Sequence, residues 1–475
     1  MTGNALLIAL MGFLFLFLGY MGVPVAFALI AAVLVVTMFT PVSEASMIAQ
    51  VFNGMDVEAL LAVPFFLLVG DLMTSAKVTN RMIALSQTIV GHWRGGLAQV
   101  VTLFSMFFAG ISGSSAADVA VLTRTLAPEM TREGYDRGFT AALIASAATM
   151  ANLIPPSIMA VIYGATGNVS IGGLFLAGVV PGVLVGIGLM IYSHFFGPVG
   201  FKRKRATLGQ FAVATKEAAI PLMIPVIIMG GILTGQFTPT EAGIIAVAYI
   251  VAVVIPFLNF RHLGQLPRDM AMTGLLYSIP LITIGAASAF GWMLAYLRGP
   301  AVVSEWLASL AGNDPNKIML LLVGLFVIVG DFIDAVPAII IFMPLIMDLT
   351  KNADINPVHM GAVIITTLAF GLITPLRAVL VDGGEIRRDK VFQGDAGVAA
   401  DLYRVFRGNR IHNLFSGRRA LATEAPVTAI GRLLSEPERR RIYLPVSLRH
   451  GSRRQHAPSQ AQGAQGHLRH AHAHL

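Results

Sequence analysis

Residues 110–115 read Gly-Ile-Ser-Gly-Ser-Ser and interrupt the middle of a long apolar stretch that covers residues 97–127. A second long stretch, residues 317–350, is interrupted in the same way by Gly-Asp-Phe-Ile-Asp-Ala at residues 330–335. Unpaired backbone groups and carboxylates are costly in hydrocarbon unless they are buried in protein or line a wet cavity. We therefore expect each stretch to enter the membrane, turn at its interruption and return as a re-entrant hairpin.

The two interruptions belong to a repeated layout. Gly110 and Gly330 differ by 220 positions, and so do Pro155, in Leu-Ile-Pro-Pro, and Pro375, in Ile-Thr-Pro. Because one offset matches two landmarks, the sequence predicts an internal repeat with one hairpin and one unwound helix in each half.

The composition is that of a membrane protein. Apolar residues make up 56% of the 475 residues, charged residues make up 12%, and the mean hydropathy is +0.75. A soluble domain carries about 25% charged residues, so the chain is not a cytosolic enzyme. We predict an all-α polytopic membrane protein whose transporter domain, residues 1–375, divides into halves near 1–200 and 217–375. Apolar runs of spanning length predict helices near 4–20, 24–40, 57–75, 138–163, 172–197, 217–234, 240–258 and 270–297, with a last one from 357.

Charge is unevenly distributed along the chain. Residues 1–375 carry 16 Lys and Arg against 17 Asp and Glu, whereas residues 376–475 carry 17 against 8. The basic character therefore belongs to the tail, and it gives no reason to expect nucleic-acid binding by the near-neutral body.

Basic loops predict the orientation in the membrane. If residues 97–127 return to the side of the membrane from which they entered, all the basic loops lie on one face. The positive-inside rule makes this face cytoplasmic, so the N-terminus lies outside. Counting spans then places Asn313, Asp314 and Lys317 on the opposite face, so the second hairpin enters from outside and the repeats are inverted, as in many secondary transporters. The basic residues are Lys77, Arg81, Arg94, Arg124, Arg132, Arg137, Lys202, Arg203, Lys204, Arg205, Arg261 and Arg268.

The breaks predict an ion and substrate site. A hairpin tip or unwound helix leaves carbonyl oxygens without partners, and these suit a hard cation such as Na⁺, while half-helix N-termini suit an anionic substrate. Pro155-Pro156 removes two amide donors and forces such a break. Plainer roles stay open, because a serine can cap a helix and an aspartate can lie at the water interface. The candidate residues are Ser112, Gly113, Ser114, Ser115, Asp118, Asn152, Pro155, Pro156, Asp331 and Asp334.

The sequence does not indicate enzyme chemistry. The chain contains no Cys, and its body shows neither a P-loop spacing nor a Ser-His-Asp arrangement or transition-metal ligand pair. We expect no catalysis and no cofactor besides Na⁺ as a coupling ion, so an ion gradient or partner chains must supply the energy.

Several motifs together resemble those of one family. They are Phe-Ala-Gly-Ile-Ser-Gly-Ser-Ser-Ala-Ala-Asp at 108–118, Leu-Ala-Pro-Glu-Met at 126–130, Gly-Tyr at 134–135, Asn-Leu-Ile-Pro-Pro-Ser at 152–157, Tyr-Gly at 163–164 and Gly-Leu-Ile-Thr-Pro at 371–375. Over residues 1–375 the chain resembles the large membrane subunit, of the DctM type, of tripartite ATP-independent periplasmic (TRAP) transporters.

The resemblance implies an elevator-type, ion-transporter-like carrier in the bacterial inner membrane. A mobile domain would carry two hairpins and two unwound helices, and a scaffold would hold the other spans and dock a smaller membrane subunit. A periplasmic substrate-binding protein would deliver an organic acid, such as a C4-dicarboxylate, a keto acid or a sugar acid, and Na⁺ would drive its import. By match, Ser112–Ser115 and Asn152–Pro156 would form one half of the site, and Asp331, Asp334, Thr374 and Pro375 would form the other.

Two other functions fit the same pattern. A stand-alone dicarboxylate or ion transporter would have similar inverted repeats. A membrane scaffold without transport would share the composition. Genes for a periplasmic binding protein and a four-helix membrane protein beside this one would favour the tripartite carrier over both.

The tail, residues 376–475, departs from the family pattern. Pro375 is followed by Leu-Arg-Ala where the family continues with Pro-x-Gly and a closing apolar span, and in the tail Arg outnumbers Lys 16 to 1. We hypothesise a frameshift just after Pro375, because codons for residues 384–406 can be chosen that encode an apolar span in another frame. The alternatives are a disordered basic extension on anionic lipid and a metal site at His467, His470, His472 and His474. Sequencing codons 370–380 tests the frameshift, which an intact frame with no nearby alternative reading would contradict.

Overall fold

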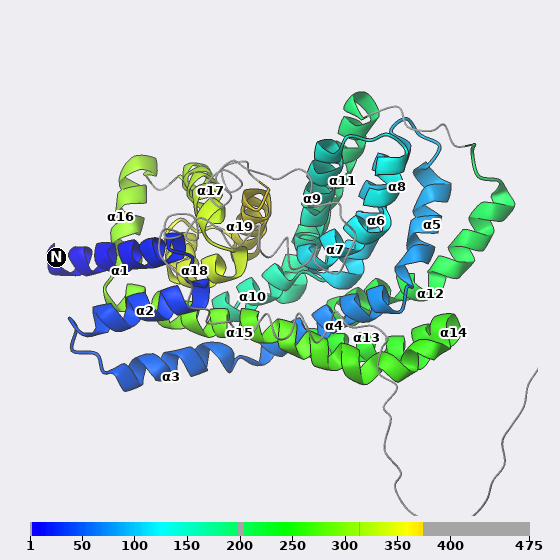
Figure 1. Ribbon diagram of the computed structural model, residues 1–475. Helices are drawn as coiled ribbons and strands as arrows, with labels where there is room; N and C mark the ends of the chain where they lie inside the picture. The colour runs from blue at the N-terminus through cyan, green and yellow to red at the C-terminus, as the bar shows by residue number, and fades with distance from the viewer. Residues whose placement is uncertain (1, 198–203, 313, 374–475) are drawn as a thin grey trace, which may run out of the picture. The chain divides into compact units, whose positions relative to one another are not determined.

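The computed structural model describes residues 2–197, 204–312 and 314–373, which form helices and short connections, with no β-strand in these ranges (Figure 1). The predicted site residues Thr374 and Pro375 lie outside the described residues, as do the tail 376–475 and the histidines of its alternative metal site. The same holds for Lys202, Arg203 and Asn313 of the orientation argument.

Nineteen α-helices are described, together with four shorter helical segments that are labelled η and of which η3 is a π-helix. In chain order they are α1 (Thr2–Tyr20), α2 (Val25–Thr37), α3 (Glu44–Met55), η1 (Glu58–Leu61), α4 (Ala62–Ser75), α5 (Thr79–Val90), α6 (Gly96–Ser112), α7 (Ser115–Thr125), α8 (Ala127–Arg132), α9 (Arg137–Ala148), η2 (Thr149–Asn152), α10 (Ile158–Gly167), α11 (Ile171–Phe196), α12 (Leu208–Leu233), α13 (Pro239–Tyr249), η3 (Ile250–Val254), α14 (Ile255–Asn259), η4 (Phe260–Gln265), α15 (Leu266–Tyr296), α16 (Gly299–Ala311), α17 (Pro315–Phe332), α18 (Ala335–Asn352) and α19 (Pro357–Gly371).

The expected membrane architecture is confirmed. Within the described ranges, six helical segments are long and apolar enough to cross a membrane, so the protein is an all-α polytopic membrane protein. The sequence did not predict α3, α5 and α16, because their 12 or 13 residues are shorter than the apolar runs that identify a span. The six segments are Gly3–Tyr20, Glu58–Ser75, Ile171–Phe196, Leu208–Leu233, Pro239–Tyr296 and Ala335–Asn352.

Helix α11 shows how a membrane helix divides its two faces. Its exposed side is a line of large apolar side chains, which suits contact with lipid. Its buried side carries glycines at a spacing of four residues, and small residues let neighbouring backbone approach closely. The exposed residues are Leu176, Val180, Leu184, Ile187 and Ile191, and the buried glycines are Gly178, Gly182 and Gly186.

Both interrupted stretches break at the predicted places. The first consists of α6 and α7 with Gly113 between them, and the second consists of α17 and α18 with Ile333 and Asp334 between them. The predicted span 138–163 is likewise split into α9, η2 and α10, with the break at Pro155-Pro156. A straight helix through either hairpin would have contradicted the interpretation as a carrier.

The helix boundaries follow the offset of 220 that the sequence motifs predicted. Four pairs of ends obey it: α5 and α16 begin at Thr79 and Gly299, α6 and α17 end at Ser112 and Phe332, α7 and α18 begin at Ser115 and Ala335, and α9 and α19 begin at Arg137 and Pro357. The packing recurs too, because α6 packs on α9 and α17 packs on α19 (Figure 1). That the two copies have opposite orientations in the membrane stays a prediction.

One difference between the copies concerns α3, η1, α4 and α15. In the first copy the chain turns at Asp56 and Val57 between α3 and the segment of η1 and α4. In the second copy the corresponding positions lie inside α15, a continuous helix of 31 residues. Helix α15 packs against α2, α3, α4 and α18, so it joins elements from both copies.

Candidate functional site

The first hairpin turns at Gly113, which has a φ of 58°. A side chain in this left-handed region costs about 1–2 kcal/mol, so glycine is the suitable residue. The next residue, Ser114, caps α7: its hydroxyl oxygen accepts a hydrogen bond from the Ala117 N–H at 3.5 Å. The Ser112 hydroxyl accepts one from the Ser114 N–H at 3.4 Å. The plainer capping role is therefore confirmed for Ser114.

The second element of the site is the break at Pro155-Pro156, whose peptide bond is cis. Neither proline has an N–H group, so the carbonyls of Ala151 and Asn152 lose their helical donors. Ser157 compensates one of them, because its hydroxyl donates a hydrogen bond of 2.5 Å to the Asn152 carbonyl oxygen. The same side chain caps the N-terminus of α10.

The hairpin tip and the break lie in direct contact. The Gly113 carbonyl oxygen accepts a hydrogen bond from the Ile158 N–H at 3.5 Å. A Cβ atom on Gly113 would overlap the carbonyl oxygen of Pro156, so glycine is required here by proximity as well as by conformation. The two groups of residues that the sequence assigned to the first half of the site are thus brought together.

The buried face of α11 supports the broken segment from behind. A Cβ atom on Gly178 would overlap the carbonyl oxygen of Leu153, and one on Gly182 would lie 2.6 Å from the Ile154 side chain. The backbone of the break therefore rests directly on the helix. A side chain larger than hydrogen at either position would displace this part of the break.

A buried carboxylate lies in the hairpin close to the tip. Asp118, in the first turn of α7, is 0% exposed, and neither of its carboxylate oxygens has a hydrogen-bond partner. The amide nitrogen of Asn152, which is 4% exposed, also lacks a partner. Ser115 is only partly buried. Burial of an unpaired polar group costs free energy, so these groups do not serve stability.

The second hairpin places its two aspartates differently. Asp331, near the end of α17, is 3% exposed, so it is buried in the protein and does not lie at the water interface. Asp334 is exposed and occupies the N-cap position of α18, but its side chain makes no capping hydrogen bond. Nearby, α17 and α19 cross closely at two glycines: a Cβ on Gly330 would lie 3.2 Å from the Gly371 Cα.

The two halves of the candidate site meet through three helices. In the described part of the chain, α18 packs on α10, and α19 packs on η2, α10 and α11. Helix α10 begins directly after the Pro155-Pro156 break, so the second hairpin packs beside the first-half site. Close packing of α6 or α7 on α17 or α18 is not found among the described residues, so the two parts of the candidate site are joined through α10, α18 and α19.

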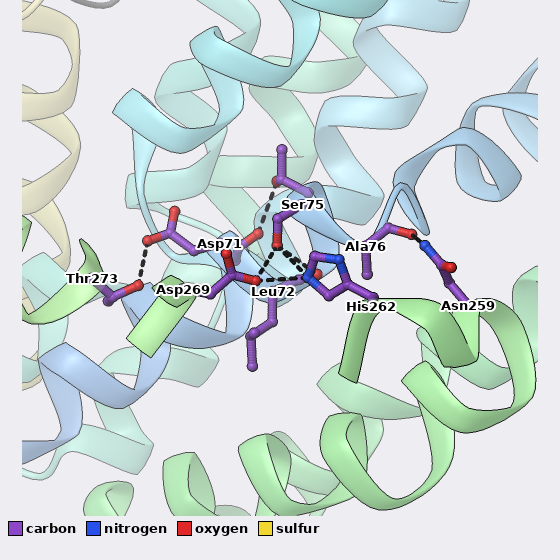
Figure 2. A network of polar contacts seen from close by, with 10 residues as sticks. Asp71, Leu72, Ser75, Ala76, Asn259, His262, Asp269 and Thr273 are labelled. Atoms are coloured by element: carbon purple, nitrogen blue, oxygen red, sulfur yellow. Dashed lines mark hydrogen bonds and ion pairs between the residues drawn. The ribbon is translucent and has the colours of Figure 1, made fainter. Parts of the chain in front are cut away.

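A polar network between α4 and α15 was missed by the sequence analysis (Figure 2). The Ser75 hydroxyl donates to the Asp269 carboxylate at 2.9 Å, and His262 Nε2 lies 3.1 Å from that hydroxyl and 2.7 Å from the same carboxylate. The Thr273 hydroxyl donates to the Asp71 carboxylate at 2.7 Å. We call these five residues the α4–α15 clasp.

The clasp connects α4 and α15 to the first hairpin. Asp71 also interacts electrostatically with Arg124, at the end of α7, and with Asp269. The signal that could have revealed it is Asp71 itself, because an ionisable residue inside a predicted span usually has a function or a partner. Its hydrogen-bond partner Thr273, in contrast, lies 202 residues away in the chain and follows from the tertiary structure alone.

The clasp should contribute measurably to stability. We expect Thr273→Val to lower the free energy of unfolding by about 1.5–3 kcal/mol, because it removes a hydrogen bond to a partly buried charged group while keeping the side-chain shape. The measurement is the melting temperature of the purified protein in detergent. The control is Thr283→Val on the same helix, whose hydroxyl donates only to the Ile279 carbonyl of its own helix. Equal effects of the two changes would contradict a role for the clasp.

Comparisons with known proteins identify the family to which the chain belongs. Residues 11–379 match the family model described as "Tripartite ATP-independent periplasmic transporter, DctM component". The C4-dicarboxylate TRAP transporter large permease protein DctM of Pseudomonas aeruginosa is 35% identical over 348 residues, which cover 73% of this chain and 81% of that protein. The sialic acid TRAP transporter large permease protein SiaM of Vibrio cholerae is 35% identical over 379 residues, or 77% and 87%. The 2,3-diketo-L-gulonate TRAP transporter large permease protein YiaN of Escherichia coli is 33% identical over 363 residues, or 74% and 84%.

Proposed function

Because the chain belongs to the DctM family of TRAP transporter permeases, multi-pass proteins of the bacterial inner membrane, we propose that it is the large permease subunit of a Na⁺-coupled importer of an organic acid. The observation that carries the proposal is the contact between the hairpin tip at Gly113 and the break at Pro155-Pro156. Two broken backbone segments that meet inside a helical membrane protein are typical of the ion and substrate sites of secondary transporters.

The chemistry of these segments supports a hard cation and an anionic substrate. The prolines leave carbonyl oxygens of η2 without helical donors, and carbonyl and hydroxyl oxygens are the ligands that hard cations prefer. Helices α7, α10 and α18 begin at the three breaks, and the N-terminus of a helix attracts a carboxylate. Three of the related permeases are named for C4-dicarboxylates, sialic acid and diketogulonate, which are carboxylic acids. An organic acid is therefore the substrate class that we propose.

Two partners follow from the proposed function. The relatives are each named a large permease protein, which implies a smaller membrane subunit, and the family description is of a tripartite periplasmic transporter. We propose that this chain docks such a subunit and receives its substrate from a periplasmic binding protein. The binding protein would then select the acid, so the membrane site needs only modest discrimination.

The experiment is uptake by proteoliposomes that contain the permease and the small subunit, with the binding protein and its radiolabelled ligand outside. We expect accumulation to require an inward Na⁺ gradient and to fail with K⁺ at the same ionic strength. Ser114→Ala and Asp334→Asn should each weaken the dependence on Na⁺, because each removes an oxygen at a hairpin tip. Uptake without Na⁺, or unchanged Na⁺ activation in both variants, would contradict the assignment.

Because the tail departs from the family pattern, the chain must be tested in two forms, as given and frame-corrected. The family match ends at residue 379, and we propose that residues 376–475 result from a frameshift just after Pro375. Both the chain as given and a frame-corrected chain should enter the uptake experiment. We expect transport from the frame-corrected chain alone, since only that chain completes the second unwound helix. Full transport by the chain as given would contradict the frameshift proposal.

A further inference from the structure

The two arms of the first hairpin hold a buried carboxylate and a buried hydroxyl. Asp118 lies on α7 and Ser105 lies on α6, and both are 0% exposed. The Ser105 hydroxyl interacts with the carboxylate, but no hydrogen bond of ordinary geometry reaches either carboxylate oxygen or the hydroxyl. The hairpin therefore contains polar atoms that it does not satisfy internally.

No cationic side chain in the described part of the chain neutralises the negative charge of the Asp118 carboxylate. No Lys, Arg or His among the described residues forms an ion pair with Asp118. The N-terminus of α7 offers only the partial charge of a helix end. A carboxylate away from water requires a partner of opposite charge, and an unpaired one is strongly unfavourable.

The second hairpin provides an internal control. At the offset of 220 that relates the helix boundaries, Ser105 corresponds to Leu325 and Asp118 corresponds to Ala338. Ala338 is fully buried, and Leu325 packs against the apolar core. The same helix–break–helix layout thus forms with an apolar pair at these positions. Folding of a hairpin does not require the acid, so its presence in the first copy needs another reason.

We propose that Asp118 and Ser105 bind a Na⁺ ion between the arms of the first hairpin, at a site additional to the one at the tip. A carboxylate and a hydroxyl supply hard oxygen ligands. One carboxylate neutralises one monovalent charge, whereas a divalent ion would leave a buried positive charge. The segment η2, which carries the unpaired amide of Asn152, packs on both arms and closes the site. The choice of Na⁺ rests on the proposed function, but the existence of a cation site does not.

The test is the Na⁺ dependence of the melting temperature of the purified full chain in detergent. NaCl replaces choline chloride at constant ionic strength, and KCl serves as a second comparison. We expect Na⁺ to raise the melting temperature of the unmodified chain, because a ligand that binds only the folded state stabilises it. In Asp118→Asn we expect the Na⁺ concentration for half of this effect to increase at least tenfold. In Ser105→Ala we expect an increase in the same direction.

Matched variants separate this site from others. Asp354→Asn changes an exposed aspartate in a turn and should leave the Na⁺ response unchanged. Ser114→Ala changes the hairpin tip but leaves Asp118 in place. We therefore expect this variant to keep the part of the Na⁺-dependent rise in melting temperature that Asp118→Asn loses. If Asp118→Asn does not yield a folded protein by gel filtration, the Ser105→Ala response decides.

Three results would overturn the proposal. The first is a folded Asp118→Asn protein in which the Na⁺ concentration for half of the rise in melting temperature is unchanged. The second applies if Asp118→Asn does not fold, and it is an unchanged Na⁺ concentration for half of the rise in Ser105→Ala. The third is a melting temperature of the unmodified chain that does not respond to Na⁺. Failure of the proposed function has a different signature, since the frame-corrected chain would then show Na⁺ stabilisation that depends on Asp118 but no Na⁺-driven uptake of an organic acid.

Discussion

Gly113→Ala should reduce Na⁺-driven uptake by at least tenfold while the protein still reaches the membrane. Gly113 has a φ of 58°, where a Cβ atom costs about 1–2 kcal/mol. The new Cβ would also overlap the Pro156 carbonyl oxygen, so the hairpin tip and the break must separate. The overlap acts at the candidate site itself, so we attribute the loss of uptake to separation of the tip from the break and not to the conformational cost. The measurement is uptake by proteoliposomes that contain the frame-corrected chain, with or without the Gly113→Ala change, at equal protein content.

The control for Gly113→Ala is Gly134→Ala. Gly134 also has a positive φ, 84°, but a Cβ atom there would meet nothing within 4 Å. This variant carries the conformational cost without the overlap, so we expect a lower melting temperature with uptake largely retained. Equal loss of uptake in both variants would show that backbone strain, and not the contact between tip and break, is responsible.

Gly178→Ala should both destabilise the protein and impair transport. In an isolated helix the same change stabilises by about 1 kcal/mol, because alanine has the higher helix propensity. On α11, however, the new Cβ would overlap the Leu153 carbonyl oxygen, and backbone in a packed core has little room to move. We expect the melting temperature to fall and uptake to decrease several-fold, because the broken segment is displaced toward the hairpin tip.

The control for Gly178→Ala lies on the same helix. A Cβ atom on Gly188 would meet nothing within 4 Å. We expect Gly188→Ala to leave uptake unchanged and to raise the melting temperature slightly, as helix propensity predicts. If Gly178→Ala behaved in the same way, the close contact between α11 and the break would have no functional importance.

The breaks were predictable because the residues that cause them act locally. Gly113 permits a left-handed turn, and Pro155-Pro156 removes two donors wherever the chain places them. The offset of 220 that the sequence motifs showed also relates helix ends far from those motifs, such as Thr79 and Gly299, although the sequence did not predict the helices that begin there. Helices α3, α5 and α16 were not predicted, because about 20 apolar residues identify a span and these helices are shorter and more polar.

Residues with distant partners were the ones that the sequence could not assign. Asp71 was passed over inside an apolar run, and its partner Thr273 lies 202 positions away. Ser105 stood among apolar residues in α6 with no feature to distinguish it, and only the folded hairpin brings it to Asp118. For Asp331, the sequence left burial and interfacial exposure open, and packing decided for burial.

The amino-acid sequence by itself determined that this protein resides in a membrane, where its helices break and which residues form each break, because hydrophobicity, proline and glycine act over a few residues. The tertiary structure alone decided that the tip at Gly113 touches Pro156, that α11 supports the break, and that the acid of the first hairpin is buried without a partner. These outcomes depend on which helix faces meet, and that is settled by the close packing of side chains from segments far apart in the chain.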